Sequence, residues 1–147
     1  EPHTCPCRTF VDARGLHGLS CRRSAGRHTR HSQLNDIIWR SLCRAKIPAS
    51  KEPLGLTRSD GKRPDGVTLI PWSHGKCLTW DVTVPDTMAT SHVQATSTAA
   101  GAAADRAAAN KKTKYAALQS THIFVPVSVE TMGSWNCESL NFVNNIG

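Results

Sequence analysis

Apolar residues recur at helical spacing in the segment that begins at Ser32. This spacing predicts an amphipathic helix of about three to four turns. Ser32 is suited to cap the first turn, and Pro48 ends the element because a proline cannot continue a helix. The apolar stripe consists of Leu34, Ile37, Ile38, Leu42 and Ala45.

Two strands are predicted downstream, at residues 63–72 and 76–84, because both stretches are rich in Val, Thr, Leu, Ile and Trp. Ser73-His74-Gly75 forms a hairpin-like link between them, and residues 53–61 are expected to be a loop or a short strand. Side chains alternate along a strand, so Asp81 is expected on a polar surface rather than in the core. Its face carries Cys77, Thr79, Asp81 and Thr83, and the other face carries Leu78, Trp80, Val82 and Val84.

The remaining sequence predicts a long alanine-rich helix at residues 97–118, a strand at 122–129 and a short closing helix at 138–146. Gly101 is the weak point of the long helix, and Pro126 places the strand at a sheet edge or beside a bulge. The small residues of the helix allow it to lie close to a sheet, which would bring its lysines near the strand ends. Its stripe is Ala100, Ala104, Ala107, Lys111, Lys114 and Leu118.

This order of elements predicts an α/β sandwich in which the long helix crosses between parallel strands. The length of 147 residues fits one domain with one core. Residues 1–31 lack periodicity and are rich in Arg, Gly, His and Cys, so we expect them to fold around a metal or not at all. We therefore expect a Cys/His knuckle with a basic linker at 1–31 and a second domain at 32–147. Because the chain begins at Glu1 rather than at methionine, we also expect it to be a piece of a longer protein.

Charge and cysteine content narrow the functional classes. The chain has 18 Lys and Arg against 11 acidic residues, and the net charge of +7 favours a polyanionic partner over the alternative of a merely soluble basic domain. No apolar run reaches the roughly 18 to 20 residues of a membrane span, and no secretory leader is expected, so we predict no membrane partner. Of the six cysteines, Cys5, Cys7 and Cys21 lie close together and Cys43, Cys77 and Cys137 are dispersed, which predicts a reducing, intracellular compartment with free or metal-bound thiols.

Cys5, Cys7, His17 and Cys21 offer three thiols and one imidazole in two close pairs. Such a set predicts a closed, tetrahedral structural zinc site, although the one-residue gap in the first pair is shorter than the usual two to four. The alternative is a flexible segment with scattered thiols. Other histidines could replace a wrongly assigned ligand, namely His3, His28 and His31.

Basic residues follow the knuckle directly and would present a cationic surface if the metal orders this region. Arginine suits phosphate because its planar fork binds two oxygens at once. These residues predict binding to DNA, with RNA as a further possibility, and the alternative is a solvated charged connector. They are Arg22, Arg23, Arg27, His28, Arg30 and His31.

Asp65 and Asp81 lie on neighbouring predicted strands and could hold one Mg²⁺ or Mn²⁺. Such an ion polarises a phosphodiester and stabilises the leaving oxygen, so the pair predicts phosphodiester cleavage. Glu52 could complete the metal shell. Lys114 is the favoured lysine beside the reacting phosphate and Lys111 is the reserve. In the alternative interpretation Asp65 caps a turn and the lysines form a solvated helix end.

Several motifs in combination resemble the C-terminal restriction-like endonuclease region of non-LTR retrotransposon reverse transcriptase proteins. The resemblance covers nearly the whole chain. It rests on the segment from His17 to Cys21, on Arg27-His28-x2-His31-x2-Leu34-Asn35-Asp36-Ile37-Ile38, on Gly61-Lys62-Arg63-Pro64-Asp65-Gly66, on Trp80-Asp81-Val82-Thr83-Val84 and on Lys111-x2-Lys114-Tyr115.

The resemblance implies a PD-(D/E)XK restriction-endonuclease-like αβββαβ core with an N-terminal zinc knuckle. It makes Asp65 and Asp81 the acidic ligands, Arg63 part of the Arg/Lys-Pro-Asp motif, and Lys114 and Tyr115 part of the catalytic helix. The implied activity is nicking of target DNA in the nucleus, so that the freed 3′ hydroxyl primes the reverse transcriptase domain of the same parent chain. Thr83 departs from this pattern because the superfamily carries a lysine there.

The sequence thus favours a metal-dependent DNA endonuclease domain. The alternative is a non-catalytic, zinc-stabilised nucleic-acid-binding module that positions a larger enzyme. A zinc-stabilised protein-interaction domain is a third class, but it leaves the placement of the carboxylates and lysines unexplained.

Overall fold

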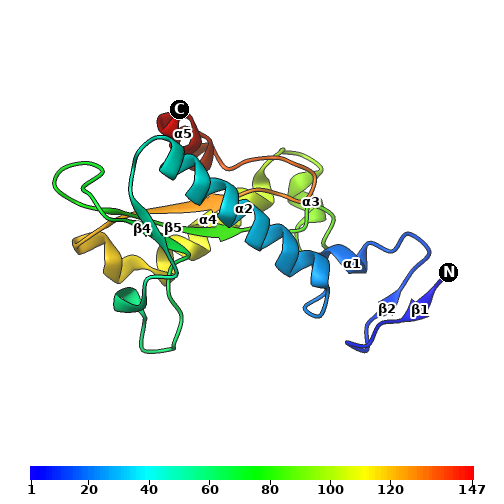
Figure 1. The fold of residues 1–147 in the computed structure, drawn as a ribbon. Coiled ribbons are helices and arrows are strands. Elements are labelled where there is room, and N and C mark those ends of the chain that lie inside the picture. The colour runs from blue at the N-terminus through cyan, green and yellow to red at the C-terminus, as the bar shows by residue number, and fades with distance from the viewer.

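A computed structural model describes residues 1–147 and contains a four-stranded mixed sheet with helices on both faces (Figure 1). The strands, in spatial order, are β3 (Ala49–Lys51), β4 (Gly66–Thr68), β5 (Leu78–Thr83) and β6 (Ile123–Ser128). The pairs β3–β4 and β4–β5 are antiparallel, whereas β5 and β6 are parallel. The prediction of an α/β fold is confirmed.

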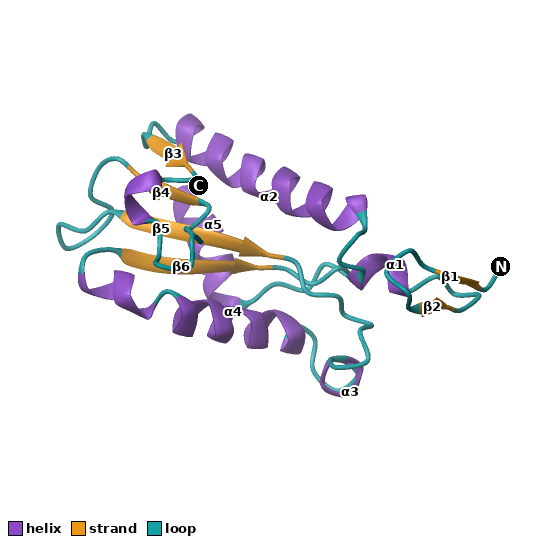
Figure 2. Cartoon of the chain, turned by 90° about the horizontal axis from the view of Figure 1, so that it is seen from below, coloured by secondary structure: helices purple, strands orange, loops and turns teal.

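Three helices form the two outer layers. α2 (Ala25–Arg44) and α5 (Cys137–Ile146) pack on one face of the sheet, and α4 (Ala102–Lys114) covers the other face (Figure 2). Because α4 connects the parallel strands β5 and β6, it is the predicted crossover. The order from α2 to β6 is αβββαβ once the very short helix α3 (Val93–Thr96) is left aside.

The hydrophobic core lies between the sheet and the layer formed by α2 and α5. Trp80 is its centre: the ring is fully buried, and its Nε1–H donates to Asn35 Oδ1 at 2.8 Å. Gly66 on β4 lies against this ring so closely that a Cβ at that position would overlap it. The predicted alternation is confirmed, because the core consists of Ile38, Leu42, Leu78, Trp80, Val82, Val125, Val127 and Phe142.

Helix α2 begins seven residues earlier than predicted, at Ala25 with Ser24 as its N-cap, and ends at Arg44. The prediction of a start at Ser32 was wrong because the first turns carry no apolar stripe. They are fixed by the preceding segment instead: the Arg30 guanidinium donates to the Leu19 carbonyl at 2.9 Å. The helix therefore runs without interruption through the expected boundary between residues 31 and 32.

Helix α4 is shorter than the predicted 97–118. Gly101 has a φ of +86° and serves as the N-cap of α4, so the expected weak point is in fact a helix boundary. A left-handed residue cannot lie inside a right-handed helix, and only glycine adopts this conformation at little cost. A separate short helix, α3 (Val93–Thr96), precedes α4, and the 3₁₀ helix η2 (Ala116–Ser120) follows it.

On the β3–β4 side the strand predicted at residues 63–72 was too long, because β4 covers only Gly66–Thr68, and two further short features differ from the predictions. β3 has only three residues, and a 3₁₀ turn, η1 (Leu54–Leu56), occupies part of the segment expected to be a loop or strand. The predicted hairpin link is confirmed: Ser73 and Lys76 form a bridge, and His74 and Gly75 between them have φ values of +49° and +71°. Positive φ at both central positions is typical of a tight two-residue turn.

β6 is an edge strand, as Pro126 predicts, because β5 is its only neighbour. Its outer side is covered by the start of α5. The Ser128 N–H donates to Ser139 Oγ at 2.8 Å, and the Ser139 hydroxyl donates to the Pro126 carbonyl at 2.9 Å. The Asn136 N–H also donates to the Ser128 carbonyl at 3.0 Å.

The N-terminal segment forms a small separate substructure, which we call the knuckle (residues 1–24). It contains the hairpin β1 (His3–Thr4) and β2 (Phe10–Val11) and the short helix α1 (His17–Ser20). All six cysteines of the chain are free thiols. No helix combines the length and apolar character needed to cross a bilayer.

Candidate functional site

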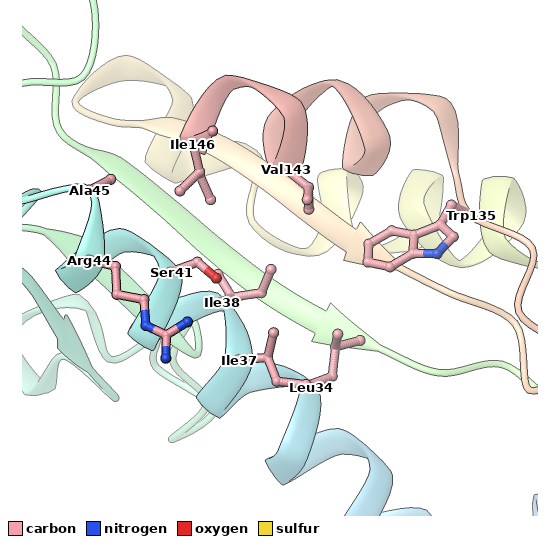
Figure 3. A pocket seen from close by; sticks show the side chains of 10 residues that line it. Leu34, Ile37, Ile38, Ser41, Arg44, Ala45, Trp135, Val143 and Ile146 are labelled. Atoms are coloured by element: carbon pink, nitrogen blue, oxygen red, sulfur yellow. The ribbon is translucent and has the colours of Figure 1, made fainter.

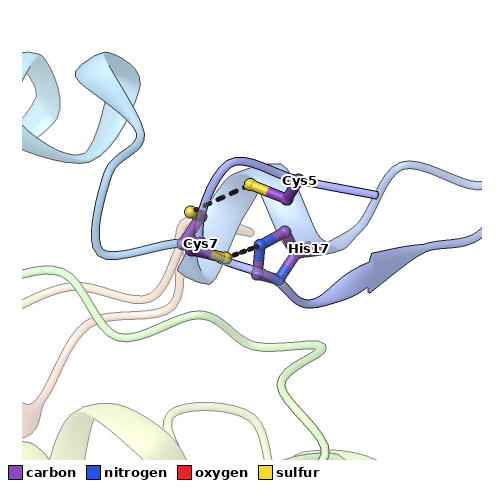
Figure 4. A group of neighbouring side chains, drawn as sticks. Cys5, Cys7 and His17 are labelled. Carbon is purple, nitrogen blue, oxygen red and sulfur yellow. Dashed lines mark hydrogen bonds between the residues drawn. The ribbon is translucent and has the colours of Figure 1, made fainter. Parts of the chain in front are cut away.

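The four predicted zinc ligands converge in the knuckle. Figure 4 labels three of them, Cys5, Cys7 and His17. Their ligand atoms all lie within 4.8 Å of one another. Cys5 Sγ is 3.6 Å from Cys21 Sγ, and Cys7 Sγ is 3.1 Å from His17 Nε2. A tetrahedral zinc with Zn–S bonds of about 2.3 Å would hold two sulfurs about 3.8 Å apart. Three thiols and one imidazole at these separations fit a closed structural zinc site.

A tight turn explains how the short first gap is accommodated. The Arg8 N–H donates to the Cys5 carbonyl at 2.7 Å, the Cys5 N–H donates to the Thr9 carbonyl at 2.9 Å, and Arg8 has a φ of +73°. This turn brings Cys5 and Cys7 to the same side of the loop. Hydrogen bonds from the side chain and the backbone of Thr9 lower the pKa of Cys7 to about 6. The thiolate, which is the form that binds metal, is thereby favoured.

The alternative ligands lie elsewhere. His3 Nδ1 lies 3.0 Å from the Glu1 carbonyl, His28 is exposed on α2, and His31 contacts Asp65. The predicted set of four is therefore the group that could hold zinc.

A second group of titratable side chains, which we call the carboxylate cluster, gathers around Asp81 on β5 (Asp65, Asp81, His31, Lys111 and Tyr115). Asp81 is 3% exposed, and its Oδ2 forms an ion pair with Lys111 Nζ of α4. The Tyr115 hydroxyl lies 3.4 Å from Asp81 Oδ1 and 2.8 Å from the Arg63 carbonyl. The expectation that Asp81 faces a polar surface was wrong. The small side chains of α4 allow that helix to lie close to the sheet and bury this carboxylate.

Asp65 immediately precedes β4 and contacts two other elements. Its Oδ2 accepts hydrogen bonds from the Val82 N–H of β5 at 2.6 Å and from His31 Nε2 of α2 at 3.0 Å. The Asp65 N–H donates to the Trp80 carbonyl at 3.0 Å, which extends the β4–β5 ladder by one bond. These contacts hold the Asp65 carboxylate beside β5. The carboxylate therefore does not cap a turn, which was the alternative interpretation.

The electrostatics show that the two acids act on each other. Burial raises the pKa of Asp81, the charge of Lys111 opposes this effect, and the charge of Asp65 raises the pKa further. The hydrogen bond to Asp65 raises the pKa of His31. Burial also raises the pKa of Tyr115, so its hydroxyl stays protonated. Buried acids of this kind are stabilised in their charged form by a nearby cation.

The structure places the two lysines differently from the predicted preference. Lys111, the reserve, pairs with Asp81, whereas Lys114 Nζ lies 4.6 Å from the centroid of the Tyr115 ring. Burial and the charge of Lys111 lower the pKa of Lys114. Sequence spacing placed both lysines on one stripe and could not distinguish them.

Glu52 does not join the cluster. Its side chain is 65% exposed and forms an ion pair with Arg63 at 2.6 Å. The backbone still lies close by, because the Glu52 N–H donates to the Asp65 carbonyl at 2.8 Å. The side chains of Glu52 and Arg63 therefore pair with each other outside the carboxylate cluster.

The predicted basic surface divides into three groups. Arg23 donates to the Pro6 carbonyl at 3.0 Å and Arg30 to the Leu19 carbonyl, so both brace the backbone of the knuckle. Arg22, Arg27 and His28 are exposed, and their side chains form no intramolecular hydrogen bond. His31 belongs to the carboxylate cluster instead, a role that its charge alone did not predict. One indication was present: His31 lies one turn from Asn35, which binds Trp80, and the two share a face of α2.

An apolar groove between α2 and α5 lies on the opposite face of the sheet from α4 (Figure 3). Its volume is about 590 Å³. Leu34 and Ile37 line one wall, and Trp135, Val143 and Ile146 line the other. The groove has no acidic side chain, so its chemistry is separate from that of the carboxylate cluster.

The arrangement offers one site suited to zinc and one cluster of oxygen ligands with an adjacent lysine. No protein-family model matches the chain, and no curated protein matches it significantly.

Proposed function

We propose that this chain is a divalent-metal-dependent DNA endonuclease domain of the restriction-like type found in retrotransposon proteins, with a PD-(D/E)XK core. The observation that carries the proposal is the buried Asp81, which pairs with a helix lysine and whose pKa is raised by the charge of Asp65, the residue directly before β4. The αβββαβ order of elements and the motif resemblance support it. In this proposal the activity is nicking of target DNA to prime reverse transcription.

In this proposal Asp65 and Asp81 are the donors for Mg²⁺ or Mn²⁺. Both ions prefer carboxylate oxygens, which Asp81 of β5 and Asp65, directly before β4, would supply. Asp65 Oδ1 accepts no hydrogen bond, and Lys111 is the only partner of Asp81 Oδ2. When bound, the ion would polarise the phosphodiester and favour attack by water.

The surrounding residues have distinct roles in this proposal. His31 and the Val82 N–H hold Asp65 in place, and the Tyr115 hydroxyl lies against Asp81. Lys111 offsets the charge of Asp81 and is placed to stabilise negative charge on a phosphate beside it. A lysine supplied by α4 would thus take the role of the strand lysine, whose position in this chain is occupied by Thr83.

The knuckle would contribute a structural Zn²⁺ and exposed basic residues that contact nucleic acid. Arg22, Arg27 and His28 are free to do so, and the net charge of +7 favours DNA, or RNA, as the partner. The remaining partner in this proposal is the reverse transcriptase domain of the same parent chain, and the compartment is the nucleus.

Plasmid nicking tests the activity directly. Purified zinc-loaded protein should convert supercoiled DNA to the open circle with Mg²⁺ or Mn²⁺, and Asp81→Asn should slow this by about 100-fold or more because it removes a metal ligand. Asp36→Asn is the matched control: Asp36 lies on the exposed side of α2, paired with Arg40 and Lys51. Nicking that needs no added divalent ion, or equal rates for Asp81→Asn and wild type, would contradict the proposal.

The second candidate is a non-catalytic nucleic-acid-binding module that positions a larger enzyme. The observation that favours it is the ion pair of Lys111 with Asp81, which neutralises the acid without any metal. This candidate predicts DNA binding by the zinc-loaded protein, with no nicking by any divalent ion.

A further inference from the structure

Two cations lie over the aromatic ring of Tyr115, whose hydroxyl lies 3.4 Å from Asp81 Oδ1 in the carboxylate cluster. The Arg58 guanidinium is 5.7 Å from the centroid of the Tyr115 ring, and Lys114 Nζ is 4.6 Å from it. Arg58 also donates to the Lys114 carbonyl at the end of α4, where a cation is favoured by the helix dipole. We call Arg58 and Lys114 the Tyr115 cation pair.

The cation pair lines a cavity between the loop at residues 55–59 and the helix end at 113–118. The cavity has a volume of about 510 Å³. Its loop is held by two backbone bonds: the Arg58 N–H donates to the Lys62 carbonyl at 2.7 Å, and the Gly61 N–H donates to the Arg58 carbonyl at 2.9 Å. The arginine is therefore presented from a fixed turn rather than from a mobile segment.

Positive charge exceeds negative charge around this cavity. Asp60 is the one acidic partner of Arg58, at 3.3 Å, and Lys114 has no acidic partner. Burial and the charge of Lys111 lower the pKa of Lys114, the charge of Asp81 opposes this effect, and the charges of Lys62 and Arg58 lower the pKa further. Cations held close together without matching acids are stabilised by a bound anion.

We propose that Arg58 and Lys114 bind the phosphate backbone of the DNA strand beside the bond on which the carboxylate cluster acts. This inference rests on the proposed function and gives Lys114 a binding role in place of the chemical role first expected. Placement on shared elements supports it. Lys114 follows Lys111 by one turn on α4, and the loop of Arg58 leads within seven residues to Asp65.

The test measures DNA binding without cleavage. Zinc-loaded protein is titrated against a fluorescein-labelled 20-base-pair duplex by anisotropy, in buffer without Mg²⁺ or Mn²⁺, at several salt concentrations. The double variant Arg58→Gln/Lys114→Gln should bind about tenfold more weakly and should reduce the slope of log K against log salt by about two. The control Arg40→Gln/Lys46→Gln removes the same charge from exposed positions on and just after α2, and it should leave the slope unchanged.

Two further variants separate binding from folding. The charge-preserving variant Arg58→Lys/Lys114→Arg should keep the wild-type salt slope, and the single variant Lys114→Gln should lower the slope by about one because its ammonium makes no intramolecular hydrogen bond. A wild-type slope in Lys114→Gln, or no binding by wild type, overturns the inference. If wild type binds through these residues but never nicks DNA, the nuclease proposal fails, and only the phosphate-binding role of Arg58 and Lys114 stands. If it nicks DNA with an unchanged slope in the variants, only this inference fails.

Discussion

Trp80 shows at the scale of single residues how the core and the carboxylate cluster share one strand. Its indole fills the core on one face of β5, and its N–H is paired with Asn35 of α2. The next residue, Asp81, points to the other face and meets α4. Gly66 leaves room for the ring on the neighbouring strand. The position of Asp81 is therefore determined by how tightly Trp80 packs.

Gly66→Ala tests this packing. The added Cβ would overlap the Trp80 ring, so we expect a loss of about 1–3 kcal/mol in the free energy of unfolding. Urea denaturation followed by tryptophan fluorescence measures it. Gly55→Ala is the matched control, because a Cβ there meets nothing within 4 Å and the φ is not positive. Equal stability of the Gly66→Ala protein and wild type would contradict the packing described here.

Single residues differ in how far the sequence predicts them. The four knuckle ligands could be predicted because their chemistry and close spacing are local, and the structure brings them together. Asp65 and Asp81 were both expected on strands; Asp81 lies on β5, whereas Asp65 directly precedes β4, and their function stays a prediction. The contacts of His31 and the choice of Lys111 depend on how α2 and α4 dock on the sheet, which local spacing does not determine.

At the scale of elements, the placement of α4 decides where its lysines lie. The helix starts at the left-handed Gly101, and its first turn is held by Glu130 from the segment after β6. Glu130 is 2% exposed, and its Oε1 accepts hydrogen bonds from the N–H groups of Ala103 and Ala104 at 2.9 and 3.3 Å. This carboxylate satisfies backbone donors that the helix leaves free and complements its dipole.

Glu130→Ala should lower the free energy of unfolding by about 1–3 kcal/mol, because two buried N–H groups lose their acceptor. Glu130→Gln should lose less, since its amide oxygen can still accept both bonds. Hydrogen exchange at the amides of Ala103 and Ala104, together with urea denaturation, measures the effect. Glu138→Ala removes an exposed partner of Lys112 and should cost under about 1 kcal/mol. If Glu130→Ala cost no more than Glu138→Ala, the capping role would be wrong.

The type of an element could be predicted where its hydrophobic periodicity is clear. The boundaries of an element could not be predicted where contacts with other segments determine them. β6 and α5 match their predicted ranges to within one residue at each end. β3 has three residues, too few to show an alternation, so hydrophobic periodicity did not predict it. The start of α2 was missed because its first turns pack on the knuckle rather than on the core.

At the scale of the whole molecule, two parts of the chain depend on different forces for their folded structure. One is the knuckle, and the other is residues 25–147, which we call the sheet domain. Within residues 1–24 only Val11 and Cys21 are buried, so this part has almost no apolar core. The sheet domain buries the continuous core around Trp80. The knuckle should therefore derive its order from the metal, and the sheet domain should not.

Removing zinc should consequently affect the two parts unequally. We expect one zinc per chain, and a chelator should make residues 1–24 sensitive to protease while urea unfolding of the core stays cooperative. Cys7→Ser should lose the metal, whereas Cys43→Ser changes an exposed thiol on α2 and should retain it. Metal analysis and limited proteolysis with mass spectrometry measure both. A Cys7→Ser protein that retains a full equivalent of zinc would rule out the assigned ligand set.

The outer side of β6 has a consequence for how copies of this protein behave at high concentration. An exposed sheet edge usually offers a row of donors and acceptors on which a second chain can continue the sheet. Here Pro126 has no N–H to offer, and Ser139 and Asn136 already occupy the outward groups of Ser128. At Pro126 and Ser128 a strand from a neighbouring molecule therefore finds no free ladder, so this part of the edge disfavours continuation of the sheet even though the strand itself is apolar.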